Sequence, residues 1–242
     1  MGDRKNYKEI KIVPDLERII PDRLAPHSRR LLQEHIDRYM FAKAYTLHKK
    51  VADIACGSGY GSNLIANGGA RKVIGIDSDE STIRYAKKRY RRQNVIYKVG
   101  DAHCLDMISQ TIDVVISFET IEHMKHPMKF LSEVKRVLKR SGTLLISTPN
   151  SNYSMRDNPF HLKEYALKEL NHLLGRYFRS IILFGQRPVF EPIMRLYHFL
   201  SRIIPPYLLP LLQMRPWEKL DIRKLDSMHE DGYLYFIAVC QK

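Results

Sequence analysis

A glycine-rich turn is the first pattern in the sequence with a definite chemical use. Gly57, Gly59 and Gly61 follow a short apolar run and precede a helical pattern. Glycine allows a sharp turn and lets the backbone approach a ligand closely, and the N–H groups at a helix start attract a negative group. Ser62 stands at the third glycine position of the dinucleotide pattern. The carboxylate of Asp53, just before the turn, opposes a pyrophosphate but suits an ammonium group.

Two further acidic residues follow apolar runs. Asp77 lies about 20 residues beyond the turn, the spacing at which a carboxylate holds ribose hydroxyls in nucleotide-binding βαβ units. Its alternative role is a helix N-cap, which Ser78 or Asp79 supplies equally well. Asp101 follows the next run, where it predicts either a contact near an adenine amino group or an ordinary turn.

A cluster of acidic residues and histidine follows the apolar run 112–118. Glu119, Glu122 and His123 come directly after this run. Such a group serves as a general base, a metal site or a set of charges at a helix start. The last two residues of the run, Ser117 among them, fall at the edge where α/β sheets bind ligands.

The elements that must position these residues alternate along the chain. Apolar runs and amphipathic helical patterns repeat as strand, helix and strand, which is typical of βαβ units on a mostly parallel sheet. The continuous apolarity of the runs favours a sheet that is covered on both faces. The predicted strands are 51–55, 73–76, 95–99, 112–118, 143–147, 180–184 and 233–239, and the predicted helices are 60–67, 80–91, 127–138 and 164–174. The third helix is expected to stop at the basic residues before Gly142.

Composition limits the class of protein. The chain has 242 residues, 44% of them hydrophobic, which predicts a sizeable buried core. Its net charge of +14 favours nucleic acid, an anionic membrane surface or a phosphorylated substrate, or describes a simple basic protein. The three cysteines form no CxxC pair, which argues against a structural zinc site or a disulfide scaffold. Neither a signal peptide nor an apolar run of about 18 residues is present, so we expect a cytoplasmic location.

Together these motifs resemble class I S-adenosylmethionine-dependent methyltransferases of the ubiquinone-biosynthesis O-methyltransferase-like group. The matching segments occur in the family's order and are 51–61, 75–77, 100–102, 118–123 and 136–142. The chain departs from the family at Ala52, where a larger aliphatic residue is common, and at 140–142, where Pro-Gly-Gly is usual. The first departure concerns packing, and the second is remote from the expected cofactor pocket.

The resemblance implies S-adenosylmethionine as the cofactor and S-adenosylhomocysteine as its product. It implies that Asp53, Gly57 and Gly59 hold the amino-acid end of the cofactor. Asp77 would bind the ribose, while Asp101 and Ala102 would line the adenine pocket. The last residues of the fourth strand, with Glu119, would shape the methyl-transfer site. The predicted cofactor-binding residues are Arg38, Tyr39, Asp53, Ala55, Gly57, Gly59, Asp77, Ser78, Asp101, Ala102, Ser117 and Phe118.

The flanking segments resemble a narrower subgroup. Residues 34–42 and 158–165 are similar to methyltransferases associated with glycosyltransferases and surface-polysaccharide synthesis. This likeness implies that Arg38 and Tyr39 close over the cofactor, with Arg38 near its carboxylate, and that His161 lies near the acceptor. The alternative roles of Tyr39 and His161 are packing or capping.

Methyl transfer from a sulfonium mainly requires alignment of nucleophile, carbon and sulfur, and an acceptor hydroxyl must also lose its proton. We predict His123 as the base, His161 as the second candidate, and Glu119 as a further catalytic residue. No metal ligands are predicted. A divalent cation held by Glu119, Glu122 and His123, as in some relatives, is the alternative.

The predicted fold is α/β: a Rossmann-like, seven-stranded, mostly parallel sheet with helices on both faces, an N-terminal helical cap and an insertion before the last strand. The predicted single methyltransferase domain consists of a cap (1–47), a cofactor-binding core (48–185), an insertion (186–232) and the last strand (233–242). The insertion is expected to form a lid or acceptor pocket, a pair of packed helices or a dimer surface. Its apolar prolines and arginines also suit a membrane surface.

The predicted function is O-methylation of a sugar or another small or lipid-linked acceptor, at the inner face of the membrane or in the cytoplasm. A dimer is compatible with the sequence. A nucleic-acid (RNA) methyltransferase is one alternative, encouraged by the charge but lacking an RNA-binding motif. A non-catalytic cofactor-binding protein is the other.

Overall fold

The computed structural model describes residues 19–23, 29–153, 158–188, 222–228 and 232–242. Among these residues the helices are η1 (Pro21–Arg23), α1 (Arg29–Thr46), α2 (Tyr60–Asn67), α3 (Glu80–Arg89), η3 (Ile121–His123), α4 (Pro127–Val137) and α5 (Leu167–Gly175). The strands are β1 (Lys50–Ile54), β2 (Lys72–Asp77), β3 (Val95–Val99), β4 (Ile112–Phe118), β5 (Leu138–Pro149), β6 (Ser180–Pro188), β7 (Ile222–Lys224) and β8 (Tyr233–Gln241).

The described strands form an eight-stranded sheet in the order β3-β2-β1-β4-β5-β8-β6-β7. β1 pairs in parallel with β2 and β4, and β2 pairs in parallel with β3. The predicted count of seven strands needs correction, because the three-residue strand β7 pairs antiparallel with β6. β7 lies within the segment predicted as an insertion, and its pairing satisfies backbone groups along β6. The Rossmann-like character of the predicted sheet holds.

The chain divides into two compact units. The first comprises residues 1–118, 126–145 and 241–242, and the second comprises 119–125 and 146–240. β5 contributes residues to both units. The sequence prediction of one methyltransferase domain stays a prediction.

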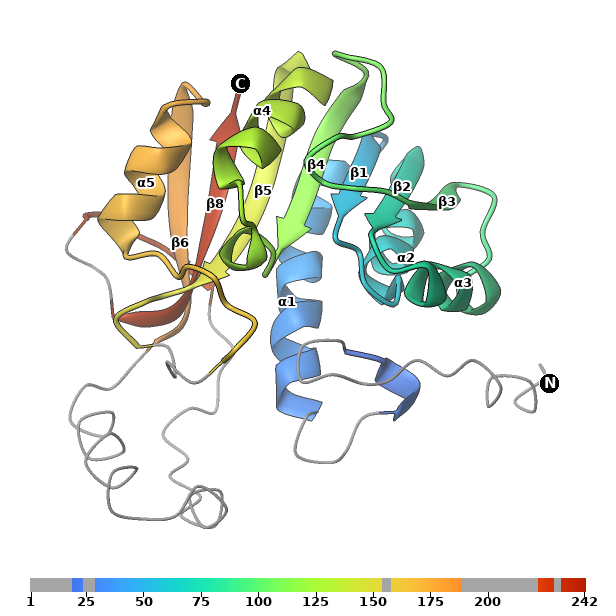
Figure 1. Ribbon diagram of the computed structural model, residues 1–242, viewed down its shortest axis with the longest axis horizontal. Coiled ribbons are helices and arrows are strands. Elements are labelled where there is room, and N and C mark those ends of the chain that lie inside the picture. Colours follow the sequence, from blue (N-terminus) through green and yellow to red (C-terminus); the bar gives the residue numbers. More distant parts are fainter. Residues whose placement is uncertain (1–18, 24–28, 154–157, 189–221, 229–231) are drawn as a thin grey trace. The chain divides into compact units, whose positions relative to one another are not determined.

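The first unit contains the strands β4, β1, β2 and β3, which lie side by side in Figure 1. Val51 and Ile116 of the neighbouring strands β1 and β4 are fully buried, as the predicted cover on both faces requires. Asp53 is in register with Gly75 of β2 and with Ile116 of β4. Because these strands are parallel, the residues that follow each of them meet at one edge of the sheet.

The start of α3 and the end of α4, both in the first unit, can be compared with the predictions from the sequence. Asp79 caps α3, since its Oδ1 accepts a hydrogen bond from the N–H of Thr82 at 2.6 Å. α4 ends at Val137, and the next residue, Leu138, is already extended and fully buried in β5. The predicted end of this helix at residue 138 agrees with the structure to within one residue, but the basic residues before Gly142, predicted as its stop signal, lie inside β5.

The second unit contains β6, β8 and α5, with α5 beside β6 in Figure 1. Gly185 of β6 lies directly under the ring of Tyr233, where a Cβ atom would come within 2.2 Å of that ring. α5 begins at Leu167, three residues later than predicted, because residues 164 and 165 are held outside the helix. Most of the predicted insertion falls on residues 189–221, outside the described residues.

Candidate functional site

The turn between β1 and α2 takes its shape from three residues in the left-handed backbone region. Ala55, Gly57 and Gly59 have φ angles of 59°, 52° and 84°. Gly59 is the N-cap of α2 and offers no side chain to the first N–H groups of the helix. The strand therefore turns into a helix start that no side chain caps, which is the form of a helix N-terminal ligand site.

Asp53 lies inside this turn rather than on its surface. Its side chain is fully buried; Ser62 donates a hydrogen bond to Oδ2 at 2.5 Å, and Tyr39 donates to Oδ1 at 3.1 Å. Burial raises the pKa of Asp53 to about 7, while these two hydrogen bonds act in the opposite direction. The predicted contact of Asp53 with an ammonium group stays a prediction. In the structure its hydrogen-bond partners are Tyr39 of α1 and Ser62 of α2.

Tyr39 joins α1 to the glycine turn. A Cβ atom on Gly61 would lie 1.9 Å from the ring of Tyr39, so the ring rests on the glycine backbone. The same ring meets Phe118 edge-on, with centroids 5.2 Å apart, and Tyr60 with centroids 5.9 Å apart. Arg38, its neighbour on α1, is fully buried. Tyr39 thus belongs to the same site as the turn, with packing as one evident role.

Asp77 ties the turn to the end of β2. Its Oδ2 accepts a hydrogen bond from the N–H of Gly57 at 2.9 Å, and its Oδ1 accepts one from Asp79 at 3.0 Å. Since Asp79 caps α3, the alternative of a capping role for Asp77 or Ser78 is not needed. The carboxylate is fixed at the carboxyl edge of the sheet, as a ribose-binding group requires.

The loop after β3 reaches the same edge. Gly100 donates a backbone hydrogen bond to the carbonyl of Asp77 at 3.0 Å. Asp101, the next residue, accepts from the backbone N–H of His103 and contacts the ring Nδ1 of His103, both at 2.8 Å. The backbone hydrogen bond, followed by the ring contact, lowers the pKa of Asp101. Asp101 is thus a turn former that remains exposed, with Ala102 beside it.

The end of β4 holds two further predicted site residues of the first unit. Ser117 is fully buried, and its hydroxyl oxygen has no hydrogen-bond partner among the described residues. Phe118 faces Tyr39, as described above. The predicted cofactor residues of α1, β1, β2 and β4 are thereby brought together through the turn, and Asp101 is joined to them through Gly100.

Glu119 begins the second unit in an unusual conformation. Its φ angle is 50°, which a non-glycine residue adopts only when its surroundings hold it there. Its N–H donates to the carbonyl of Ser147 at 3.2 Å, and the hydroxyl of Ser147 donates to its Oε1 at 2.6 Å. The side chain of the predicted catalytic residue Glu119 is thus turned toward β5.

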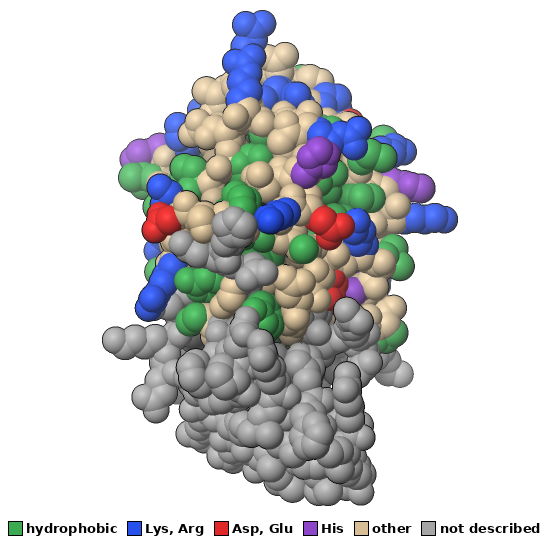
Figure 2. Space-filling view, turned by 90° about the vertical axis from the view of Figure 1, so that its left-hand side faces the viewer, with side chains coloured by type: hydrophobic (Ala, Val, Ile, Leu, Met, Phe, Trp, Pro, Cys, Tyr) green, Lys and Arg blue, Asp and Glu red, His purple; other side chains and the backbone are tan. Residues whose placement is uncertain are grey.

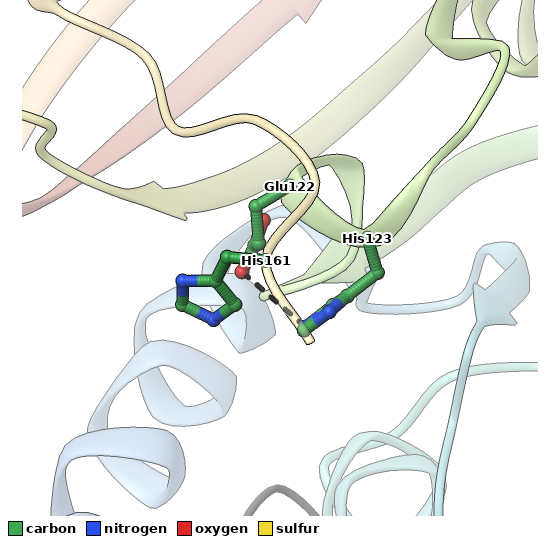
Figure 3. Close-up of side chains that lie close together, drawn as sticks. All are labelled: Glu122, His123 and His161. Carbon is green, nitrogen blue, oxygen red and sulfur yellow. Dashed lines mark ion pairs between the residues drawn. The ribbon is translucent and has the colours of Figure 1, made fainter. Parts of the chain in front are cut away.

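Glu122, His123 and His161 form a compact cluster in the second unit (Figure 3). Glu122 is fully buried, and Thr148 donates to its Oε2 at 3.0 Å. Nε2 of His123 lies 3.9 Å from Oε1 of Glu122, and the rings of His123 and His161 meet edge-on with centroids 4.9 Å apart. The structure therefore brings together the two predicted histidines and groups them with Glu122 rather than with Glu119.

Hydrogen bonds fix the tautomer of each histidine. Nδ1 of His123 lies 2.9 Å from the carbonyl oxygen of Phe160, and a carbonyl only accepts, so Nδ1 carries the proton. Nδ1 of His161 contacts Oε1 of Glu164 at 2.5 Å, and its Nε2 lies 2.9 Å from the amide nitrogen of Asn158. Nε2 of His123 therefore carries a basic lone pair, whereas both ring nitrogens of His161 contact neighbouring side chains.

The atom types in the cluster also suit a divalent cation, since the possible ligand atoms lie within 4.8 Å of one another. Both ring nitrogens of His161 are engaged, Nδ1 by Glu164 and Nε2 by Asn158. A cation bound through His161 would have to displace one of them. The sequence prediction that no metal is required stays a prediction.

The side chains that orient this cluster were not predicted from the sequence. Asn158 and Glu164 lie in the segment 158–165, for which only a resemblance to a subgroup was noted, and Thr148 lies in β5. The backbone N–H groups of Leu162 and Lys163 donate to the carbonyl of Glu122 at 2.8 and 3.0 Å. This pairing folds the segment back onto η3, and no periodicity in the sequence signals it.

Part of the chain is similar to proteins of known families. Residues 52–146 match the family model described as "Methyltransferase domain". A protein of Mycolicibacterium smegmatis named "Probable S-adenosylmethionine-dependent methyltransferase" is 41% identical over 131 residues, which cover 52% of this chain and 50% of that protein. A ubiquinone biosynthesis O-methyltransferase of Coxiella burnetii is 34% identical over 107 residues, covering 43% of this chain and 45% of that protein.

The fold has counterparts among solved structures. A S-adenosylmethionine-dependent methyltransferase from Thermotoga maritima superposes with a TM-score of 0.64 at 14% identity, covering 89% of this chain and 94% of that chain. These matches confirm the predicted methyltransferase segment, its fold and S-adenosylmethionine as the cofactor of the class. The chain spans about half the length of the curated relatives it matches, so the activity of the whole protein is argued below as a proposal.

Proposed function

We propose that this protein transfers a methyl group from S-adenosylmethionine to a hydroxyl oxygen of a sugar or of another small or lipid-linked acceptor. The observation that carries the acceptor chemistry is His123, whose Nδ1 proton is held by the Phe160 carbonyl while Nε2 lies beside buried Glu122. A base with a fixed tautomer next to a carboxylate is suited to take a hydroxyl proton.

The first unit supplies the groups suited to holding the cofactor. We assign the carboxylate of Asp77 to the ribose hydroxyls, and the start of α2, which no side chain caps, to the amino-acid carboxylate. The N–H groups of Gly57 and Gly59 themselves donate to Asp77 and to the carbonyl of Cys56, so they shape the turn. Buried Arg38 would add a positive charge for that carboxylate. When bound, the cofactor supplies an activated methyl group on a positively charged sulfur, so the protein's main tasks are binding and alignment.

The proton balance assigns His123 its role. In the proposed transfer the acceptor oxygen would gain the methyl group while the carbon–sulfur bond of the cofactor breaks, with its electrons left on sulfur. The acceptor's proton would pass to Nε2 of His123, which lies 3.9 Å from Oε1 of Glu122.

Two observations support the class of acceptor. Segment 158–165 resembles that of methyltransferases associated with glycosyltransferases, and it contributes His161 and the carbonyl of Phe160 to the histidine cluster. Figure 2 shows a face on which Lys and Arg side chains are more prominent than Asp and Glu, in keeping with the net charge of +14. Lys168, Arg176 and Arg179 are exposed on and just after α5. Such a surface suits a phosphate-bearing acceptor or peripheral contact with an anionic membrane.

The proposed contact with a membrane is peripheral. No helix among the described residues is both long and apolar enough to cross a membrane. Peripheral attachment at the inner face of the membrane, and assembly as a dimer, remain part of this proposal.

Transfer of radiolabelled methyl groups into an extract of the source cells tests the proposal. Products are separated into lipid-linked, small polar, protein and nucleic-acid fractions. We expect label in the lipid-linked or glycan fraction, a fall of about 10²–10⁴-fold in kcat for His123→Gln, and an unchanged cofactor Kd. His172→Gln, a change at an exposed histidine of α5, is the matched control. Label that nuclease releases would instead establish a nucleic-acid methyltransferase.

A further inference from the structure

The histidine cluster is held by a small hydrogen-bonded clamp made by Asn158, His161 and Glu164. Glu164 and His161 are both largely buried, with side chains 12% and 15% exposed. A carboxylate so placed needs a hydrogen-bonding partner, and Oε1 of Glu164 meets Nδ1 of His161 at 2.5 Å. Glu164 therefore holds a proton on Nδ1 of His161.

Asn158 acts on the other ring nitrogen. Its Oδ1 accepts a hydrogen bond from the N–H of Phe160 at 3.1 Å, which identifies its Nδ2 as the atom facing Nε2 of His161 at 2.9 Å. Nδ2 can only donate, so Nε2 must accept. A second proton on His161 would set two donors against each other unless the amide turned over, and turning it over would break the hydrogen bond to Phe160.

The clamp bears directly on His123. Phe160, whose N–H is held by Asn158, also provides the carbonyl that fixes Nδ1 of His123. The ring of His161 lies edge-on against the ring of His123 (Figure 3), with an interplanar angle of 69°. A neutral His161 leaves His123 able to gain a proton, whereas a charged one would repel that proton.

Three further titratable groups among the described residues lie near His161 in space or in the chain. Glu122 and His123 face it within the cluster. Lys163, its near neighbour in the chain, directs its ammonium group to Oε1 of Glu169 at 3.4 Å and over the ring of Tyr165. The amide of Asn158 is therefore the contact on Nε2 that opposes a second proton.

We infer that Asn158 and Glu164 are positioning residues that keep His161 as the neutral, Nδ1-protonated tautomer and thereby hold His123 in place as the proton acceptor. This inference rests on the proposed function for its catalytic meaning. The tautomer itself can be measured without any acceptor.

Nitrogen-15 NMR of the full chain labelled at histidine tests the tautomers, with His161→Gln and His123→Gln providing the assignments. At neutral pH we expect both rings to show a protonated Nδ1 and an unprotonated Nε2. Asn158→Asp replaces the donor with an acceptor, so His161 should become doubly protonated. Asn171→Asp, on α5, is the control for added charge. Glu164→Gln keeps an acceptor and should preserve the tautomer, while Glu164→Met should lose it.

Kinetics with the labelled acceptor fraction gives the second readout. Glu164→Met should lower kcat by at least about tenfold with KM unchanged, and Glu164→Gln should restore it. In Asn158→Asp the charge on His161 should lower kcat and move the acid limb of the pH–kcat profile to lower pH.

Different failures are distinguishable. A wild-type His161 with a protonated Nε2, or variants that all keep the wild-type NMR pattern, would overturn the inference. Activity lost on chelation and restored by a divalent cation would also overturn it, since the cluster would then be a metal site. Correct tautomers with no methyl transfer to any fraction would instead count against the proposed function.

Discussion

The N–H of Gly57 donates a hydrogen bond to Oδ2 of Asp77 at 2.9 Å, which joins the glycine turn after β1 to the end of β2. The carbonyl of Asp77 in turn accepts from Gly100, the residue after β3. Three strand ends are thus connected through one residue. The carboxylate that we assign to the ribose also stabilises the turn that we assign to the amino-acid end, so the two halves of the cofactor site are coupled.

Asp77→Ala should weaken S-adenosylmethionine binding by about 10-fold to 100-fold, because a hydrogen bond to a charged group contributes about 1.5–3 kcal/mol. Asp77→Asn should weaken it less, since its Oδ1 still accepts one backbone hydrogen bond. Isothermal titration calorimetry with S-adenosylhomocysteine measures the dissociation constant of each variant for comparison with the wild type. Equal affinity of Asp77→Ala and the wild type would exclude this residue from the cofactor site.

The contact between Gly61 and Tyr39 predicts that a side chain at position 61 will clash with the ring, and that removing the ring will relieve the clash. Gly61→Ala places a Cβ atom within 1.9 Å of the Tyr39 ring and should lower the free energy of unfolding by about 1–3 kcal/mol. In a Tyr39→Ala background the same change should cost much less, which urea denaturation of the double-mutant cycle measures. Gly232→Ala, where a Cβ atom meets nothing within 4 Å, is the control. An equal cost in both backgrounds would show that the ring does not rest on this glycine.

Asp53 predicts a pH dependence of stability. Burial raises its pKa from an ordinary value near 3.8 to about 7, so between these limits the folded state binds a proton that the unfolded state lacks. Stability from this group is therefore full below about pH 4 and is lost as pH rises to about 7. The upper bound on the loss is about 4 kcal/mol.

Asp53→Asn removes this titration while keeping an acceptor for Ser62 and Tyr39. Urea unfolding at pH 5, 6, 7 and 8 should show the variant gaining stability relative to the wild type as pH rises, with no further gain above about pH 8. A difference that is constant across this range would mean that the carboxyl group is ionised throughout.

The part of the fold that follows from local pattern was predictable. Strands 95–99 and 112–118 and helix 60–67 have the bounds that their apolar periodicity indicates, because burial selects the same residues in any βαβ unit. The start of β5 at Leu138, predicted at residue 143, was not predictable in this way. Basic residues before Gly142 resemble a helix end, but Leu138 is buried as part of β5, and tertiary packing outweighs the local signal.

The candidate site likewise has features that were predictable from the sequence and features that were not. The turn at Gly57 and the acidic residue Asp77 were recognisable from residue spacing within one short stretch of the sequence. The burial of Asp53 depends on Tyr39, which α1 brings from 14 positions earlier in the sequence. The clamp on His161 depends on a segment that folds back onto the carbonyl of Glu122. Contacts between separate segments of this kind leave no periodic trace, and a histidine tautomer is visible only from its hydrogen-bond partners.

The left-handed backbone of Glu119 predicts an inversion of the usual ranking of alanine and glycine. Both Glu119→Ala and Glu119→Gly lose the hydrogen bond from Ser147. A residue with a Cβ atom is strained at a φ angle of 50°. The glycine variant should therefore be more stable than the alanine variant by about 1 kcal/mol, although glycine is usually the less stabilising of the two residues.

Urea denaturation of both variants measures this difference, with Glu119→Gln as the reference that keeps an acceptor for Ser147. If Glu119 acts mainly by holding the turn, the glutamine variant should retain most of the wild-type kcat. A loss of about 100-fold or more would show that the carboxylate charge itself takes part in the reaction. Should alanine prove as stable as glycine, the turn must relax out of the left-handed region, and Ser147 would no longer determine where the chain leaves β4.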